Sequence, residues 1–224
     1  MGEGDFSMRG VSVVTATYNE RENLPLLIAR IRKVLSRVPH EVIVVDDSSP
    51  DGTYEVAREL ADLAIKRNRE GQTRCLFIGI KRAKYSTVVT IDADLENPPE
   101  LIPALLKEFV RGGYDVLVAS RRHLPRISEV LASKTIGKLI GVSDVFSNFR
   151  VYKRGRVLDF ELRLGETFGG ELLIMAWKRG YKVGEYLYEP PPRRELPRIG
   201  GRVRANLRIT WALIKVLTRY ILMP

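Results

Sequence analysis

The sequence predicts an α/β domain with a mostly parallel, mixed β-sheet. Short runs of β-branched residues alternate with helical patterns along its first half, and a polar turn follows several of these runs. Such alternation is typical of a parallel sheet covered by helices on both faces. The chain has 224 residues, of which 45% are hydrophobic, and this is enough for the core of one catalytic domain.

The expected elements follow one another from residue 11 onward. The strands expected in the first half cover residues 11–16, 41–46, 75–80, 87–92 and 115–120. Helices are expected to begin near Arg21 and Thr53, and a third to run from about Pro98 to Arg111. Residues 121–150 show no clean period. A helix over 167–178 and a strand over 182–189 follow, and three prolines then end regular structure.

We divide the chain into a flexible N-terminus (1–10), a catalytic domain (11–203) and a basic amphipathic helix (204–224). In that helix, four cations fall in a narrow stripe at about 100° per residue, and the remainder is largely apolar. They are Arg204, Arg208, Lys215 and Arg219. A cationic stripe over apolar residues suits a bilayer interface. The alternatives are docking of the apolar face on the catalytic domain or on a partner's membrane subunit.

Cysteine content and hydropathy predict the compartment. The single cysteine, Cys75, excludes an intramolecular disulfide framework, so a reducing interior is expected, and Cys75 itself is expected to be a buried apolar residue. The first ten residues contain no apolar stretch that marks export. No apolar run reaches the roughly 20 residues that span a bilayer. We therefore expect a cytoplasmic protein, peripheral on the inner face of the membrane.

The net charge of +10 predicts anionic partners. Charge alone leaves nucleic acid, acidic lipid and phosphorylated substrates open. Nucleic-acid binding is disfavoured because aromatic residues make up only 8% of the chain and are mostly scattered. An NAD-type dehydrogenase is disfavoured because no Gly-x-Gly-x-x-Gly follows the first strand.

Polar residues follow three of the expected strands, at residues 17–20, 46–53 and 92–96. In a parallel sheet such loops line the ligand crevice at one edge, so we expect the three sets to meet. Asp92 and Asp94 carry two hard anionic oxygens that suit Mg²⁺ or Mn²⁺ together with substrate phosphate. The alternative is that Asp94 caps a turn and Asp92 is solvated.

The other two sets each have a binding and a structural interpretation. The aspartates at 46–47 can accept hydrogen bonds from a nucleoside, or they can form a turn and cap the next helix. The segment 17–20 offers the aromatic face of Tyr18 for stacking, whereas Asn19 or Glu20 can cap the helix beside it.

Together, the three motifs resemble the family 2 inverting glycosyltransferases, and most closely the dolichol-phosphate mannose synthase group. The resemblance covers roughly residues 11–200, and its most specific segments are 17–23, 45–53 and 91–100. Weaker similarity lies at 120–121 and 147–150. The resemblance implies a GT-A fold, a Rossmann-like nucleotide-binding α/β domain.

The resemblance also implies roles for individual residues. The donor-binding residues implied are Thr17, Tyr18, Glu20, Asp47, Asp92 and Arg198, the last in a basic loop that closes over the diphosphate. The metal ligands implied are Asp92, Asp94 and Glu96. The acceptor-phosphate ligands implied are Arg121, Arg122 and Lys134, each of which has a solvated surface cation as its alternative. The catalytic residues implied are Asp94, Asp144 and Arg121.

This chain departs from the family pattern at several positions. Ala16 replaces a usual proline, Ser48 a common asparagine, Asn148 a glycine and Glu96 a common glutamine. Glu96 adds a third carboxylate beside the expected metal. The usual glycine-rich stretch before the metal strand is poorly matched by residues 71–79, which leaves the nucleotide open.

By resemblance, the expected reaction moves mannose from GDP-mannose onto a polyprenyl or dolichyl phosphate at the cytoplasmic membrane face. The alternatives are a related enzyme that uses UDP-glucose or another donor, and one with a different acceptor. The expected partners are a nucleotide sugar, the lipid phosphate, the membrane surface and a membrane-anchoring subunit. Nucleic acid is not an expected partner.

Overall fold

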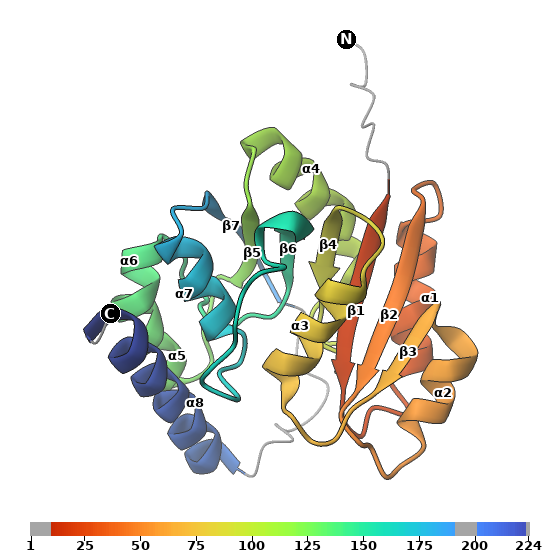
Figure 1. The fold of residues 1–224 in the computed structure, drawn as a ribbon, viewed down its shortest axis with the longest axis horizontal. Coiled ribbons are helices and arrows are strands. Elements are labelled where there is room, and N and C mark those ends of the chain that lie inside the picture. The colour runs from red at the N-terminus through yellow and green to blue at the C-terminus, as the bar shows by residue number, and fades with distance from the viewer. Residues whose placement is uncertain (1–9, 191–200, 223–224) are drawn as a thin grey trace.

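A seven-stranded sheet organises the computed structural model, which describes residues 10–190 and 201–222. The strand order is β3-β2-β1-β4-β6-β5-β7 (Figure 1). The strands are β1 (Val11–Thr17), β2 (His40–Asp46), β3 (Leu63–Lys66), β4 (Thr87–Thr90), β5 (Val116–Arg121), β6 (Arg150–Lys153) and β7 (Val183–Tyr188). Within the described ranges only β6 runs antiparallel to its neighbours, so the mostly parallel, mixed sheet is confirmed.

Helices cover both faces of the sheet. They are α1 (Leu24–Val34), α2 (Thr53–Leu60), α3 (Gln72–Arg82), α4 (Ile102–Gly112), α5 (Ile127–Ala132), α6 (Lys138–Ile140), α7 (Gly170–Lys178) and α8 (Gly201–Leu217). Short 3₁₀ turns cover Pro99–Leu101 and Arg154–Arg156, and π-helical turns cover Ser133–Gly137 and Thr218–Leu222. The segment 127–140 is therefore nearly continuous helix.

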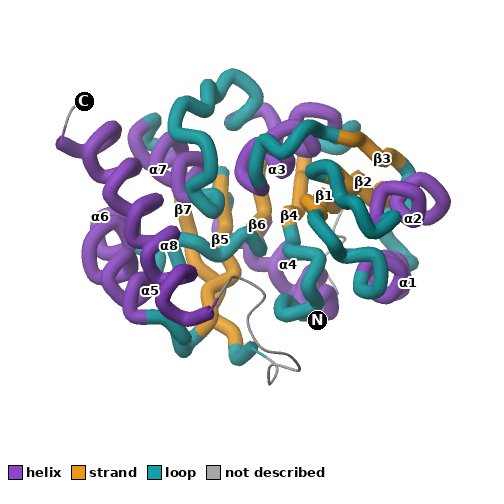
Figure 2. The backbone as a smooth tube through the Cα atoms, turned by 90° about the horizontal axis from the view of Figure 1, so that it is seen from below, coloured by secondary structure: helices purple, strands orange, loops and turns teal. Residues whose placement is uncertain are grey.

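Alternation along the central strands creates two cores. In β2, Val42 and Val44 pack on the face covered by α1, α2 and α4, whereas Ile43 and Val45 pack on the face covered by α3 and by α5 to α8. Successive side chains of a strand point to opposite faces, so an unbroken apolar run fills both cores. Figure 2 shows α5, α6, α7 and α8 gathered at one end of the sheet, beside β5 and β7.

Most predicted elements are present, and the boundaries differ by a few residues. The helix expected near Arg21 begins at Leu24, and the one expected at 167 begins at Gly170, whereas α2 begins at Thr53 as predicted. The strand predicted over 75–80 is wrong: these residues belong to helix α3, with Cys75 buried as expected. The four-residue strands β3 and β6 were not predicted.

Helix α8 confirms the predicted C-terminal helix, and its contacts show that it packs against the rest of the domain. Its residues Ile209, Leu213 and Val216 are buried in the core beside α5 and α7. The Lys215 Nζ donates to the carbonyl oxygens of Leu164 and Glu166 at 2.9 and 2.7 Å. The helix is thus docked on the domain by one face. Among the described residues, no helix has both the length and the hydropathy that crossing a bilayer requires. The predicted flexible N-terminus lies largely outside the described residues.

Candidate active site

The loops after β1, β2 and β4 meet at one edge of the sheet, as predicted. The arrowheads of β1 and β2 point to this edge in Figure 1. The backbone amide of Asn19 donates to Ser49 Oγ, and that of Glu20 donates to Thr53 Oγ1, each at 3.0 Å. These two bonds fasten the first loop to the second. The polar residues of the first two loops therefore line one continuous surface.

Backbone strain is concentrated in the loops around this edge. Five non-glycine residues of the described chain have positive φ angles, namely Asn19, Ser48, Arg69, Leu95 and Phe168. Leu95, with φ of 62°, lies between Asp94 and Glu96. A bulky side chain is rarely found in this conformation, which costs of order 1–3 kcal/mol and is characteristic of functional sites.

Asp92 is held by three side-chain amides. Its Oδ1 accepts hydrogen bonds from Gln72 Nε2 at 2.6 Å and from Asn148 Nδ2 at 3.4 Å. Its Oδ2 accepts from Asn97 Nδ2 at 3.1 Å. Burial raises the pKa of Asp92, although the hydrogen bond from Asn148 and the charge of Arg121 oppose that shift. Asp92 thus carries its charge in a protein environment that disfavours it.

Asp94 lies beside Asp92 in a strongly anionic region. Its Oδ1 accepts the Glu96 backbone amide at 3.1 Å. Although part of its surface is exposed, desolvation by the surrounding protein raises its pKa, followed by the charges of Asp92 and Glu96. The charge of Glu20 acts in the same direction, which brings the first loop to the predicted metal ligands.

This donor set fits a divalent cation. Mutually repelling carboxylates offer hard oxygens and a deficit of positive charge, which a Mg²⁺ or Mn²⁺ ion would relieve. In the described part of the chain, no group of three or more His, Cys, Asp or Glu residues is placed to hold an ion by itself. An ion at Asp92 and Asp94 would therefore need further ligands from a substrate or from water.

The aspartates after β2 are engaged in structural hydrogen bonds. Asp46 is fully buried and accepts from Thr17 Oγ1 at 3.0 Å and from the Ser49 hydroxyl at 2.5 Å. Asp47 accepts the backbone amides of Glu70 and Gly71 at 2.7 and 3.0 Å. Both side chains shape the loops at the site. Donor binding by Thr17 and Asp47 stays a prediction.

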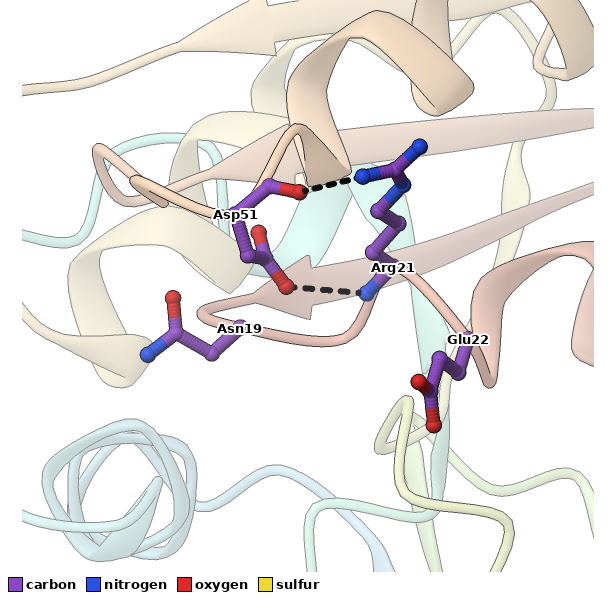
Figure 3. Close-up of a pocket in the computed structure, with 4 residues that line it drawn as sticks. All are labelled: Asn19, Arg21, Glu22 and Asp51. Carbon is purple, nitrogen blue, oxygen red and sulfur yellow. Dashed lines mark hydrogen bonds between the residues drawn. The ribbon is translucent and has the colours of Figure 1, made fainter.

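Tyr18 is 41% exposed at the same edge, and the Arg69 guanidinium lies 3.6 Å from its ring centroid. An aromatic face stacked on a cation can equally stack on a base. Next to it, a pocket of about 350 Å³ is lined by Asn19, Arg21, Glu22 and Asp51. Figure 3 shows Arg21 bridging to Asp51 through two hydrogen bonds of 3.3 and 3.4 Å, while the side chains of Asn19 and Glu22 extend away from that pair.

Arg121 and Asp144 form a buried ion pair. Arg121 Nε and Nη2 donate to the two Asp144 carboxylate oxygens at 2.7 and 3.1 Å, and Glu129 lies 3.5 Å from Arg121 Nη2. Burial acts to lower the pKa of Arg121, but the Asp144 and Glu129 carboxylates outweigh it and raise that pKa. Asp144 is 1% exposed. The structure thus brings two of the three predicted catalytic residues, Arg121 and Asp144, together as a pair, and their catalytic roles stay predictions.

The other predicted cations are less tied to the site. Arg122 is exposed, 3.5 Å from the carboxylate of Glu189. Lys134 is exposed in the helical segment 127–140. Arg198 lies outside the described residues.

The sequence interpretation missed Gln72 and Asn97, and it read Asn148 only as a departure from a family pattern. Gln72 is the first residue of α3, and Asn97 follows the metal loop. The sequence offered one signal for a helix start here, namely the polar Gln72 directly after Gly71. The segment around it was assigned to a loop and a strand instead.

Comparison with known proteins identifies close sequence relatives of this site. Residues 12–154 match the model of the family described as Glycosyl transferase family 2. A dolichol-phosphate mannosyltransferase from Pyrococcus furiosus is 44% identical over 116 residues, which are 50% of this chain and 33% of that protein. An undecaprenyl-phosphate 4-deoxy-4-formamido-L-arabinose transferase from Pectobacterium carotovorum is 37% identical over 163 residues, or 66% of this chain and 50% of that protein. The matched regions thus span a third to a half of these relatives.

Solved structures share the fold. Glucosyl-3-phosphoglycerate synthase from Mycobacterium tuberculosis, crystallised with Mn²⁺, UDP and glucosyl-3-phosphoglycerate, superposes with a TM-score of 0.77 over 95% of this chain and 80% of that one, at 19% identity. Mannosyl-3-phosphoglycerate synthase from Rubrobacter xylanophilus gives a TM-score of 0.74 over 94% and 73%, also at 19% identity. At this identity the similarity establishes the fold.

Proposed function

Because the chain belongs to glycosyl transferase family 2, we propose that it moves mannose from GDP-mannose onto a polyprenyl or dolichyl phosphate, with inversion at the sugar carbon. The observation that carries the proposal is the pair Asp92 and Asp94, fixed where the loops of three parallel strands meet. The acceptor class is supported by two relatives named for transfer to dolichol phosphate and undecaprenyl phosphate.

The reaction proposed here needs no proton transfer. An oxygen of the lipid phosphate, anionic at neutral pH, attacks the anomeric carbon and forms the new carbon–oxygen bond. The bond from that carbon to the nucleoside diphosphate breaks on the opposite face, and the diphosphate leaves with the electron pair. The protein's task is to align the two substrates and to stabilise the charge on the leaving group.

Asp92 and Asp94, with Glu96 nearby, would hold a Mg²⁺ or Mn²⁺ ion. Such an ion supplies positive charge beside the diphosphate as the sugar is transferred. Tyr18, Glu20 and Asp47 are proposed to hold the nucleoside.

We further propose that the enzyme is peripheral on the cytoplasmic face of the membrane. Helix α8 exposes Leu207, Trp211 and Ile214, and the adjacent segment 127–140 exposes Ile127, Leu131 and Leu139. We call these six residues the apolar face. Exposed cations accompany it at Lys134, Lys138, Arg208 and Arg219, and residues 201–222 contain no acidic residue. An apolar patch with cations suits an anionic lipid surface or a membrane-anchoring subunit.

The alternative candidate for the donor is a different nucleotide sugar. It is favoured by the name of the Pectobacterium relative, which describes the transfer of a modified arabinose. A transfer assay separates the candidates. Purified protein is incubated with Mn²⁺, polyprenyl phosphate and a panel of radiolabelled nucleotide sugars, with Asp92→Ala and Asp94→Ala as controls. Label should enter the organic phase with GDP-mannose and only with the unaltered protein. Transfer from another donor alone would replace the proposed substrate, and full activity of either variant would refute the metal role.

A further inference from the structure

The three amides that hold Asp92 come from three separate parts of the fold. Gln72 begins α3, Asn97 lies in the loop after β4, and Asn148 lies just before β6. Gln72 makes the shortest contact with the carboxylate, at 2.6 Å. Donors on both oxygens oppose rotation of the carboxylate about its terminal torsion, which is otherwise broad.

Two of the three amide residues make a further hydrogen bond that helps to fix them. The Tyr188 hydroxyl donates to Asn97 Oδ1 at 2.6 Å, and burial raises the pKa of Tyr188, which keeps the hydroxyl protonated as a donor. Thr90 Oγ1 donates to the backbone carbonyl oxygen of Asn148 at 2.6 Å, which fixes the backbone that carries this amide.

The neighbour of Gln72 fixes the start of α3. Thr73 donates through its backbone amide and its hydroxyl to the Glu166 carboxylate, at 3.1 and 2.6 Å. The Thr73 hydroxyl in turn accepts the Gly169 amide at 3.0 Å. Gln72 therefore projects from a helix start that is hydrogen-bonded, through Thr73, to the loop that contains Glu166 and Gly169.

Neutral donors have a specific electrostatic advantage here. An arginine or lysine in contact with Asp92 would orient the carboxylate but would also compete with a bound cation for its charge. An amide orients the carboxylate and leaves its net charge in place. Groups that orient a metal ligand in this way contribute strongly to affinity.

We propose that Gln72, Asn97 and Asn148 are positioning residues that preset Asp92 for a divalent cation, with Gln72 as the dominant member. This inference rests on the proposed function, because it concerns the same cation site. Gln72 lies in α3, outside the loop that contains Asp92 and Asp94, and it determines metal affinity through its hydrogen bond to Asp92.

The test is Gln72→Met, a change that keeps the length of the side chain and removes the donor. Mn²⁺ affinity is measured from the electron paramagnetic resonance signal of free Mn²⁺, alone and with GDP or UDP present. Gln72→Met should lose about 10-fold in affinity, a typical effect for such partners. Arg82→Met, at the exposed far end of the same helix, is the matched control and should bind as the unaltered protein does.

The outcomes separate this inference from the proposed function. Normal Mn²⁺ affinity in Gln72→Met, together with loss of binding in Asp92→Ala, would overturn the positioning role and leave the cation site intact. Normal affinity in Asp92→Ala, or no Mn²⁺ binding by the unaltered protein, would overturn the cation site and this inference with it. Unfolding temperatures measured in parallel identify any variant that loses affinity by unfolding, and Gln72→Leu, which also removes the donor without adding charge, then provides the test. Normal affinity in a folded Gln72→Leu would overturn the positioning role of Gln72.

Discussion

At the scale of single residues, the site combines carboxylates that repel one another with side-chain amides that orient one of them, Asp92. Asp92, Asp94, Glu96 and Glu20 bring negative charge together. Desolvation is the main cause that raises the pKa of Asp92 and of Asp94, and the charges of the neighbouring carboxylates add to that rise. Leu95, held in a left-handed conformation between two of these acids, adds backbone strain. Both are tolerated where the surrounding structure fixes the residues, and both make the site ready for a cation.

Asp94→Asn should therefore stabilise the metal-free protein while removing metal binding. The folded state raises the pKa of Asp94, so the ionised form destabilises the fold. That penalty is absent below the ordinary carboxylate pKa, near pH 4. It grows as the pH rises through the raised pKa of about 7 and is constant above it. In EDTA at about pH 8 the variant should unfold at a higher temperature than the unaltered protein, and the difference should vanish near pH 4.

Thermal unfolding with Mn²⁺ added completes that measurement. Mn²⁺ should raise the unfolding temperature of the unaltered protein and leave that of Asp94→Asn unchanged. A variant that is less stable than the parent in EDTA at about pH 8 would contradict the repulsion described above.

At the scale of elements, the sequence predicted the strands that carry the site and missed parts of their surroundings. Asp92 and Asp94 were found because they end a β-branched strand, a signal that is local. The residues 75–80 were misread because a short apolar run reads equally as a strand or a buried helix. With α3 misassigned, Gln72 had no helix start to occupy, and its contact with Asp92, 20 residues away, leaves no local pattern.

The same helix contains a packing constraint that a mutation can test. A Cβ added to Gly79 of α3 would lie 2.2 Å from Val14 Cγ1 of β1, so any larger residue at this position would clash with the strand. Gly79→Ala should lower the free energy of unfolding by about 1–3 kcal/mol through overpacking. Gly155→Ala, where nothing lies within 4 Å of the added carbon, is the matched control for denaturant unfolding. Equal stability of the two variants would contradict this packing.

At the scale of the whole molecule, the loops after β1 and β2 and the apolar face belong to different ends of one sheet (Figure 2). The buried pair Arg121–Asp144 and the contact of Arg121 with Glu129 of α5 lie between them. The overall α/β class followed from the alternation of strands and helices. The docking of α8 did not, because an amphipathic pattern shows that a face will be covered and not what covers it.

Trp211→Ser should weaken binding to vesicles that contain anionic lipid. The Trp211 side chain is 61% exposed on α8, so the change removes interfacial apolar area without opening the core. Val110→Ser, a 51% exposed position on α4, is the control. Co-sedimentation should show several-fold weaker binding for Trp211→Ser and weaker binding at high salt for every form. Equal retention of Trp211→Ser and the control would rule out this face as the lipid contact.

The reversed strand β6 has a consequence for which contacts of the site depend on a single segment of the chain. Since β5 and β6 run antiparallel, with Val118 opposite Arg150, the chain leaves the sheet after β5 and returns to it at the same edge. Residues 122–149 therefore form an excursion whose two ends are neighbours, while the loops of β1 and β2 lie outside it. Because this segment contributes Asp144 and Asn148, replacing it should alter the partners of Arg121 and Asp92, while the two hydrogen bonds that fasten the first loop to the second stay in place.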